Sequence, residues 1–374
     1  MRPAAVYRER IVGEMNTIDL TGACRVRGLH PAGTRLKRVV GLLLIAMTMP
    51  ALVDAADCTM TSIGLTPIND LGTGTYLGFQ GGLYPGGAKL RPAGHEAAGL
   101  SLARSIGPMN ANGDPDPNGQ YVLLSIGMSN ANQEFNVFVS DANADPGKDP
   151  ALVIVNGAQG GAKASDWASP TSPVWSELMT TLSQQSVNAN QVAVVWTKLA
   201  NSASNRTTDE YRQRLQTNSE DVFKVAQSKF PNLKLAYLAS RIYAGYATSS
   251  LNPEPFAYEF GFVMKWVIEK QLSGDPSLNF DAANGLVNAP WLSWGPYLWA
   301  DGLMPRSDGL IWACSDLRAD DGTHPSDAGK QKVASILLDF VNTDSTAKEW
   351  FLTASQAPAD TVPPAAPTNL IVGP

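Results

Sequence analysis

Residues 121–130 read Tyr121-Val122-Leu123-Leu124-Ser125-Ile126-Gly127-Met128-Ser129-Asn130. The apolar run over 121–126 is typical of a strand buried on both faces, because apolar and polar residues do not alternate along it. A serine directly after such a strand, next to glycine and asparagine, can present its hydroxyl at the rim of a sheet. Ser129 is therefore a candidate nucleophile.

Further strands and helices alternate along the chain after this run. Strand candidates cover residues 152–155, 192–196, 233–238 and 297–299. Helical patterns cover residues 173–185, 208–230, 257–271 and 326–341, the last with Ser326 as its N-cap. This alternation predicts an α/β fold with a mostly parallel, five-stranded sheet covered by helices on both faces. Functional loops of such sheets gather at the carboxyl ends of the strands.

A candidate base lies near the C-terminus, in Asp321-Gly322-Thr323-His324-Pro325. The carboxylate of Asp321 stands three residues before the imidazole, so it can bond one ring nitrogen of His324 while the other faces a substrate. The chain has three histidines, and His30 lies in the N-terminal segment interpreted below as a leader. His95 has no comparable setting. Nucleophile, base and orienting acid together are what acyl transfer requires.

Two weaker signals follow the second and third strand candidates. Gly160 and Gly161 end a Gly-rich segment whose backbone N–H groups could stabilise an oxyanion, although a plain loop would look the same. Asn201 could add a side-chain donor, or it could be an ordinary turn residue. Gly161 and Asn201 are the candidates for an oxyanion hole.

The N-terminus resembles an export signal. Arg35, Lys37 and Arg38 precede the apolar run 39–47, and Ala55 ends a small-residue cleavage site. Residues 1–55 are therefore interpreted as a leader, and we expect a secreted or periplasmic protein without stable membrane insertion; a retained membrane anchor is the alternative, disfavoured because the apolar run is too short to span a bilayer. Loss of the leader's eight Lys/Arg and four Asp/Glu leaves 20 basic and 30 acidic residues, a net charge of −10. This acidic balance argues against nucleic acid as a partner.

Cysteines and composition give further expectations. Cys58 and Cys314 remain after the leader, and export predicts that they pair as a disulfide; two separate buried thiols are the alternative. Residues 357–367 are a Pro-rich linker. No Cys/His cluster has metal-ligand spacing and no phosphate-binding motif is present, so neither metal nor cofactor is expected.

Aromatic residues cluster in the C-terminal half of the chain, where they could form core or stack on sugars. They are Tyr243, Tyr246, Trp291, Trp294, Tyr297, Trp299 and Trp312.

The order of these motifs resembles the SGNH hydrolase superfamily, also called GDSL-type esterases. Four blocks in chain order carry the resemblance: Ser129, Gly161 (with Gly160 as the alternative), Asn201, and Asp321 with His324. The text around Ser129, Gly-Met-Ser-Asn, is similar to the Gly-Gln-Ser-Asn of sialate O-acetylesterase-like carbohydrate esterases, as is a Gly-Gly pair followed by Trp. The third block departs from the family pattern, because Lys-Leu-Ala-Asn stands in place of Gly-x-Asn-Asp.

The resemblance implies a flavodoxin-like three-layer α/β/α sandwich that cleaves esters without a metal. Catalytic roles would fall to Ser129, His324 and Asp321, with Gly161 and Asn201 in the oxyanion hole. The expected function is hydrolysis of ester groups, above all O-acetyl groups, on carbohydrate. A lipase-like or small-ester hydrolase and a non-catalytic carbohydrate-binding or cell-surface protein are the alternatives.

The implied organisation has four parts. Residues 1–55 form the leader, and residues 56–117 a Gly-rich N-terminal segment that packs on the catalytic domain. Residues 118–356 form the hydrolase domain, and residues 357–374 the linker. Residues 368–372 resemble the first strand of a fibronectin type III-like module, either as the start of a truncated module or by accident.

Overall fold

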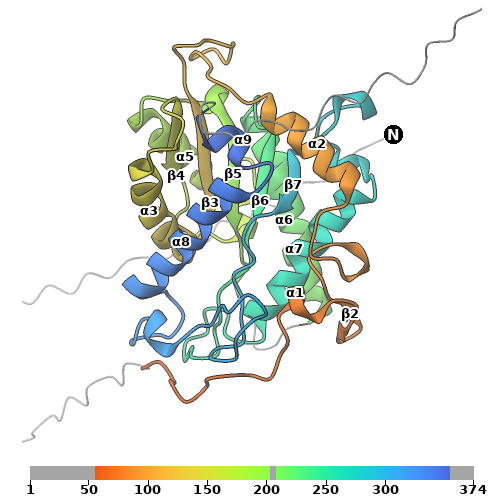
Figure 1. The fold of residues 1–374 in the computed structure, drawn as a ribbon, viewed down its shortest axis with the longest axis vertical. Helices are drawn as coiled ribbons and strands as arrows, with labels where there is room; N and C mark the ends of the chain where they lie inside the picture. The colour runs from red at the N-terminus through yellow and green to blue at the C-terminus, as the bar shows by residue number, and fades with distance from the viewer. Residues whose placement is uncertain (1–54, 203–207, 354–374) are drawn as a thin grey trace, which may run out of the picture. The chain divides into compact units, whose positions relative to one another are not determined.

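A parallel five-stranded sheet lies at the centre of the computed structural model, which describes residues 55–202 and 208–353 (Figure 1). The strand order is β4-β3-β5-β6-β7, and every neighbouring pair is parallel. The strands are β3 (Tyr121–Gly127), β4 (Leu152–Asn156), β5 (Val192–Lys198), β6 (Leu235–Leu238) and β7 (Trp291–Trp294). β3 and β5 are buried along their whole length, as their unbroken apolar runs predict.

Helices cover both faces of the sheet, which confirms the predicted flavodoxin-like α/β/α sandwich. Contacts between neighbouring helices, together with right-handed crossovers between parallel strands, define the two layers. One layer holds α2 (Ala93–Arg104), α3 (Ser129–Ala144), α8 (Asp327–Thr343) and α9 (Lys348–Phe351). The other holds α4 (Ala164–Trp167), α5 (Pro173–Gln184), α6 (Asp209–Lys229) and α7 (Phe256–Leu272). None of the helices in the described ranges is long and apolar enough to cross a bilayer.

The predicted fifth strand at residues 297–299 is wrong, and β7 lies six residues earlier. The ladder with β6 ends where Gly295 N–H donates to the carbonyl of Leu238, and Pro296 has no N–H to continue it. The N–H groups of Leu298 and Trp299 donate instead to the hydroxyl of Ser240. Both stretches are rich in aromatic residues, so composition alone did not separate them.

The helix that follows β3 was not predicted. α3 begins at Ser129, and its sequence is rich in asparagine, which favours turns over helix interiors. By contrast, α8 begins as predicted, since the side chain of Ser326 accepts a hydrogen bond from the N–H of Gly329.

The N-terminal segment is tied to the C-terminal loops. It contains α1 (Ile68–Leu71) and the short hairpin of β1 (Thr75–Tyr76) and β2 (Phe79–Gln80). The carboxylate of Asp301 accepts hydrogen bonds from the N–H groups of Ile63 and Gly64, at 2.8 and 3.0 Å.

The predicted disulfide between Cys58 and Cys314 is present, with Cα atoms 5.4 Å apart, and it joins this segment to the loop before Asp321. Residues 1–54 of the predicted leader, and the linker at 357–374, lie outside the described residues.

Candidate active site

Ser129 lies at a tight junction between strand and helix. β3 ends at Gly127, and Ser129 is the first residue of α3. A Cβ atom at Gly127 would lie 2.6 Å from both the Cβ of Ala131 and the carbonyl oxygen of Lys198, so the turn requires glycine. The serine therefore stands at a helix N-terminus, where free backbone N–H groups and the helix dipole favour negative charge.

His324 connects Ser129 to Asp321. Its Nε2 lies 2.9 Å from the Ser129 hydroxyl, and its Nδ1 lies 2.6 Å from the Oδ2 of Asp321. The other carboxylate oxygen accepts hydrogen bonds from the N–H groups of Thr323 and His324, at 2.8 and 2.9 Å. With an anionic Asp321, the proton of a neutral imidazole belongs on Nδ1, so Nε2 is free to accept from the serine hydroxyl.

The carboxylate of Asp321 is held in its charged form. Its burial raises the pKa, but hydrogen bonds from the N–H and imidazole of His324 and from the N–H of Thr323 lower it, and the net pKa lies below 3.8. The loop is fixed by Gly322 (φ +61°), where a Cβ would lie 2.1 Å from the carbonyl oxygen of Tyr246. Asn130 also ties the loop to α3 by donating to the carbonyl of Thr323 at 3.1 Å.

Gly161 and Asn201 line the same cavity as Ser129 and His324, a space of about 210 Å³. Gly160 is not among its lining residues. The two residues follow β4 and β5, so the cavity at the carboxyl edge of the sheet joins four of the five predicted site residues, and the fifth, Asp321, bonds His324. Gly161 has φ +80° and open space around its Cβ position, so its backbone conformation favours glycine.

The side-chain amide of Asn201 is held in place by hydrogen bonds to its oxygen, while its nitrogen has no partner among the described residues. Its Oδ1 accepts from the N–H of Ser165 at 3.1 Å and from the Nδ2 of Asn218 at 3.2 Å. Its Nδ2 is buried and meets no acceptor in the described chain, although buried amides normally bond fully. An oriented, unpaired N–H donor beside a nucleophile is suited to a charge that develops during reaction.

Three buried charged residues beside the site, Lys198, Glu134 and Arg241, were not predicted as site residues. Lys198, at the end of β5, donates to both carboxylate oxygens of Glu134 on α3 at 2.7 Å, and both side chains are fully buried. Burial raises the pKa of Glu134 and lowers that of Lys198, and each is opposed by the charge of the other. The departure of the third block at Lys198 was the sequence signal. The third charged residue, Arg241, follows β6 and lines the cavity, and nothing in the sequence singled it out.

His95 and the aromatic cluster belong to the core. The Nε2 of His95 lies 2.8 Å from the carbonyl oxygen of Leu292, and its ring stacks on Trp291 with centroids 4.7 Å apart. All seven aromatic residues considered for sugar stacking are buried, so that interpretation is wrong.

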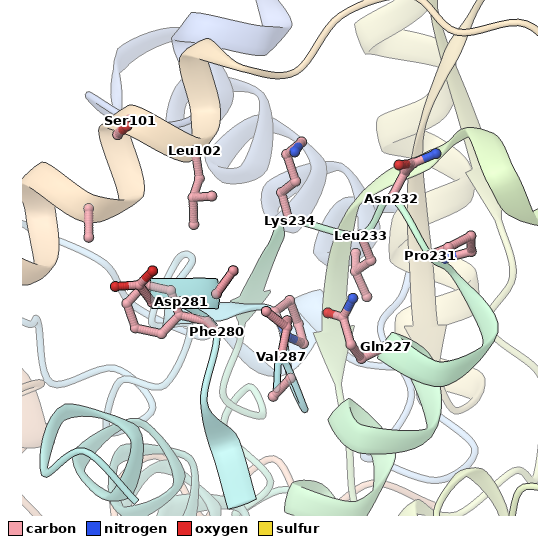
Figure 2. Close-up of a pocket in the computed structure, with 14 residues that line it drawn as sticks. Ser101, Leu102, Gln227, Pro231, Asn232, Leu233, Lys234, Phe280, Asp281 and Val287 are labelled. Carbon is pink, nitrogen blue, oxygen red and sulfur yellow. The ribbon is translucent and has the colours of Figure 1, made fainter. Parts of the chain in front are cut away.

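A larger cavity of about 480 Å³ lies at the opposite edge of the sheet (Figure 2). Leu233 and Lys234 line it directly before β6, and Pro290 does so directly before β7. Leu102 reaches it from α2. Its lining contains no serine–histidine pair, so we place the candidate site at the smaller cavity. Within residues 55–202 and 208–353, no group of three His, Cys, Asp or Glu side chains is arranged to hold a metal ion.

Comparison with known proteins finds similarity in structure alone. No protein-family model and no curated protein sequence matches the chain. The periplasmic domain of a lipopolysaccharide acetyltransferase from Salmonella ser. Paratyphi A aligns with a TM-score of 0.33 at 12% identity, covering 67% of this chain and 94% of that one. The catalytic domain of a Streptococcus pneumoniae peptidoglycan O-acetyltransferase aligns at 0.30 and 17% identity, covering 62% and 96%. A carbohydrate esterase family 3 protein from Talaromyces cellulolyticus aligns at 0.30 and 12%, covering 59% and 95%.

Proposed function

We propose that the protein is a serine ester hydrolase in which Ser129 is the nucleophile, His324 the base and Asp321 the orienting acid. The observation that carries the proposal is the continuous hydrogen-bonded chain from the Ser129 hydroxyl through the imidazole to the carboxylate, with spacings of 2.9 and 2.6 Å. The resemblance of the four sequence blocks to SGNH hydrolases supports the same roles.

In the first half-reaction, the Ser129 Oγ attacks the ester carbonyl carbon while His324 Nε2 takes the hydroxyl proton. The carbonyl oxygen becomes an oxyanion, which accepts hydrogen bonds from Asn201 Nδ2 and from the backbone N–H groups of Ser129 and Gly161. Collapse of this intermediate breaks the bond to the alcohol oxygen, and the imidazolium returns its proton to that oxygen. An acyl-serine remains.

In the second half-reaction, water gives a proton to His324 Nε2 and attacks the acyl-serine carbonyl. The second oxyanion collapses, the serine oxygen leaves with the proton from the imidazolium, and a carboxylic acid is released. Asp321 holds the imidazole in one tautomer and stabilises its cationic form throughout.

We infer that the substrates are short O-acyl esters, such as O-acetyl groups on carbohydrate. The cavity of about 210 Å³ is smaller than most pockets for drug-sized ligands, which favours an acetyl group over a long acyl chain. The similarity of the text around Ser129 to that of carbohydrate esterases supports sugar as the alcohol. The proposed site of action is an oxidising compartment outside the cytosol, in keeping with the Cys58–Cys314 disulfide and the predicted leader.

Covalent labelling with a fluorophosphonate tests the nucleophile directly. We expect one adduct, on the peptide that contains Ser129, in the wild-type protein and in the Ser101→Ala variant, whose change lies at the larger cavity. Ser129→Ala should take up no label. A folded wild-type protein that neither takes the label nor hydrolyses acetylated sugars or 4-nitrophenyl esters would instead support a non-catalytic binding protein.

A further inference from the structure

Arg241 is a buried cation with an unused donor edge. The residue is 2% exposed and lines the same cavity as Ser129 and His324. Its Nε and Nη2 atoms find no hydrogen-bond acceptor anywhere in the described ranges, and its Nη1 donates there to the Sδ of Met128, at 4.0 Å. Burying a charge without a hydrogen-bonding partner costs free energy. A ligand that binds beside Ser129 could supply the missing partner of Arg241.

The two unpaired atoms define what that ligand would be. The Nε–H and Nη2–H bonds point from one edge of the planar guanidinium and match the two oxygens of a carboxylate. Two other arginines of this protein use the same edge in this way. Arg306 donates from Nε and Nη2 to the two oxygens of Asp308 at 2.8 and 2.6 Å, and Arg318 does the same to Asp320.

The carboxylates near Arg241 are already bonded to other donors. Both oxygens of Glu134 accept from Lys198 Nζ. Those of Glu254 accept from Trp299 Nε1 and from the N–H groups of Ala244 and Tyr258, at 2.8 to 3.0 Å. Neither forms an ion pair with Arg241, so the arginine is not explained as a structural partner of either one.

The cavity itself has a positive lining in an acidic protein. The chain carries a net charge of −6, yet the lining includes Lys163 and Arg241 and no aspartate or glutamate. Lys163 is exposed. Such a lining raises the local concentration of anions and suits a negatively charged substrate.

We propose that Arg241 binds a carboxylate of the substrate, so that the enzyme prefers esters whose molecule also carries a carboxylate. This inference rests on the proposed esterase function and adds a substrate class to it. A cavity of about 210 Å³ places the reacting carbonyl and the carboxylate within a few bonds of each other. The carboxylate can belong to the alcohol, as in an O-acetylated uronic acid, or to the acyl group, as in a dicarboxylic acid monoester.

Two matched pairs of substrates test the preference and locate the carboxylate. The first pair is O-acetyl glucuronic acid and its methyl ester; the second is 4-nitrophenyl hemisuccinate and 4-nitrophenyl butyrate. We expect wild-type kcat/KM to favour the acid of at least one pair. In Arg241→Met, the acid-to-neutral ratio for that pair should fall roughly 10- to 100-fold, because a charge-assisted hydrogen bond is lost. Lys234→Met, which removes a cation at the larger cavity, should keep the wild-type ratio.

Inhibition of the wild-type protein provides a measurement that does not depend on the variant folding. With 4-nitrophenyl acetate as substrate, glucuronate or succinate should inhibit competitively at concentrations at which glucose and succinamide do not. Equal kcat/KM for acid and neutral partners of both pairs, with no selective inhibition, would overturn the role of Arg241 and leave the esterase intact. Absence of hydrolysis of all four esters would instead remove the proposed function itself.

Discussion

The two edges of the central sheet carry cavities of opposite character. The cavity before β6 and β7, at the amino edge, is larger, about 480 against 210 Å³, but its lining contains no serine–histidine pair. The one at the carboxyl edge is small and is bordered by the Ser129–His324–Asp321 chain and by buried charges. The loops that follow parallel strands converge at the carboxyl edge of the sheet. Functional residues therefore gather at that edge, whatever the volume of the cavity there.

The edges also differ in how their buried polar groups are paired. Among the residues that line the cavity at the carboxyl edge, the buried side-chain atoms without a partner in the described part of the chain are the donors of Asn201 and Arg241. At the amino edge, the Oε1 of Gln227 lacks a donor, but this side chain is only partly buried. Unpaired donors that face a nucleophile suit an anion in the transition state or the substrate. Activity should therefore respond to changes at one edge and not at the other.

The largest effect is expected from the reacting pair. Ser129→Ala and His324→Ala should each lower kcat/KM for a 4-nitrophenyl ester by roughly 10⁵-fold or more, and the double variant should be little worse than either. Initial rates at high enzyme concentration measure this. Losses that multiply in the double variant would show that the two residues do not act as a unit.

Asp321→Asn should lower kcat by roughly 10³- to 10⁴-fold, because the amide no longer holds the proton on Nδ1 of His324. The comparison variant is Asp320→Asn, one residue away on the exposed side of the loop, where the carboxylate bonds Arg318. That variant should keep near wild-type turnover. Similar losses of turnover in both variants would mean that activity depends on the conformation of the loop and not on the carboxylate that bonds His324.

Asn201→Ala should lower kcat by roughly 10²- to 10³-fold with a smaller change in KM, because in the proposed mechanism its Nδ2 bonds the oxyanion rather than the ground state. Steady-state kinetics separate the two parameters. A rise in KM at constant kcat would place Asn201 in substrate binding and leave the oxyanion to backbone donors.

Glu254, in the loop that follows β6 at the carboxyl edge, should make the stability of the protein depend on pH. Burial raises the pKa of Glu254 from 4.5 to about 7, against hydrogen bonds from Trp299, Ala244 and Tyr258. Between these two values the folded protein holds a proton that the unfolded chain has released, so the free energy of unfolding falls as pH rises.

Glu254→Gln should remove this slope. Relative to the variant, the free energy of unfolding of the wild type should fall by roughly 1–3 kcal/mol between pH 4.5 and 7. The lower figure is favoured because Glu254 is partly exposed to solvent. Urea unfolding at both pH values measures it, with Ser101→Ala at the amino edge as the reference. Parallel pH profiles for wild type and Glu254→Gln would contradict the raised pKa.

The smallest effect is expected at the amino edge. Ala98→Leu adds bulk to the lining of the larger cavity and should change kcat/KM by less than about twofold, since no group there takes part in the proposed reaction. The thermal midpoint should be measured alongside. A fall in activity of tenfold or more without loss of stability would mean that this cavity also serves the reaction.

The sequence predicted the fold well where its signals were local. Alternating apolar runs and helical patterns identified four of the five strands of the sheet, and Ser326 marked the start of α8. α3 escaped because its asparagines favour turns, and β7 was misplaced because residues 291–294 and 297–299 are equally aromatic. Which of the two aromatic stretches forms the strand depends on which backbone N–H groups can continue the hydrogen-bonded ladder with β6. That is decided by the neighbouring segments in the fold and not by the residues of the stretch alone.

The candidate site was predictable where a short motif carried the residues. Ser129, Asp321 and His324 stood in recognisable text, and Gly161 and Asn201 followed from strand ends. The pair of Lys198 with Glu134, separated by 64 residues, was out of reach because only the packing of α3 against β5 joins them. Arg241 was not predicted for a related reason. It stands out because no acceptor among the described residues surrounds its Nε and Nη2 atoms, and the surroundings of a side chain cannot be read from the sequence.

The disulfide between Cys58 and Cys314 has a consequence for how the protein is made. The two cysteines are 256 residues apart, so Cys58 has no correct partner until nearly all of the described region has been synthesised. At about 5–20 residues per second, that wait lasts roughly 10–50 s. Cys24 precedes both, so in the full-length chain it is a possible wrong partner for Cys58. If the predicted leader at residues 1–55 is removed before Cys314 is synthesised, Cys314 is the one cysteine left with which Cys58 can pair.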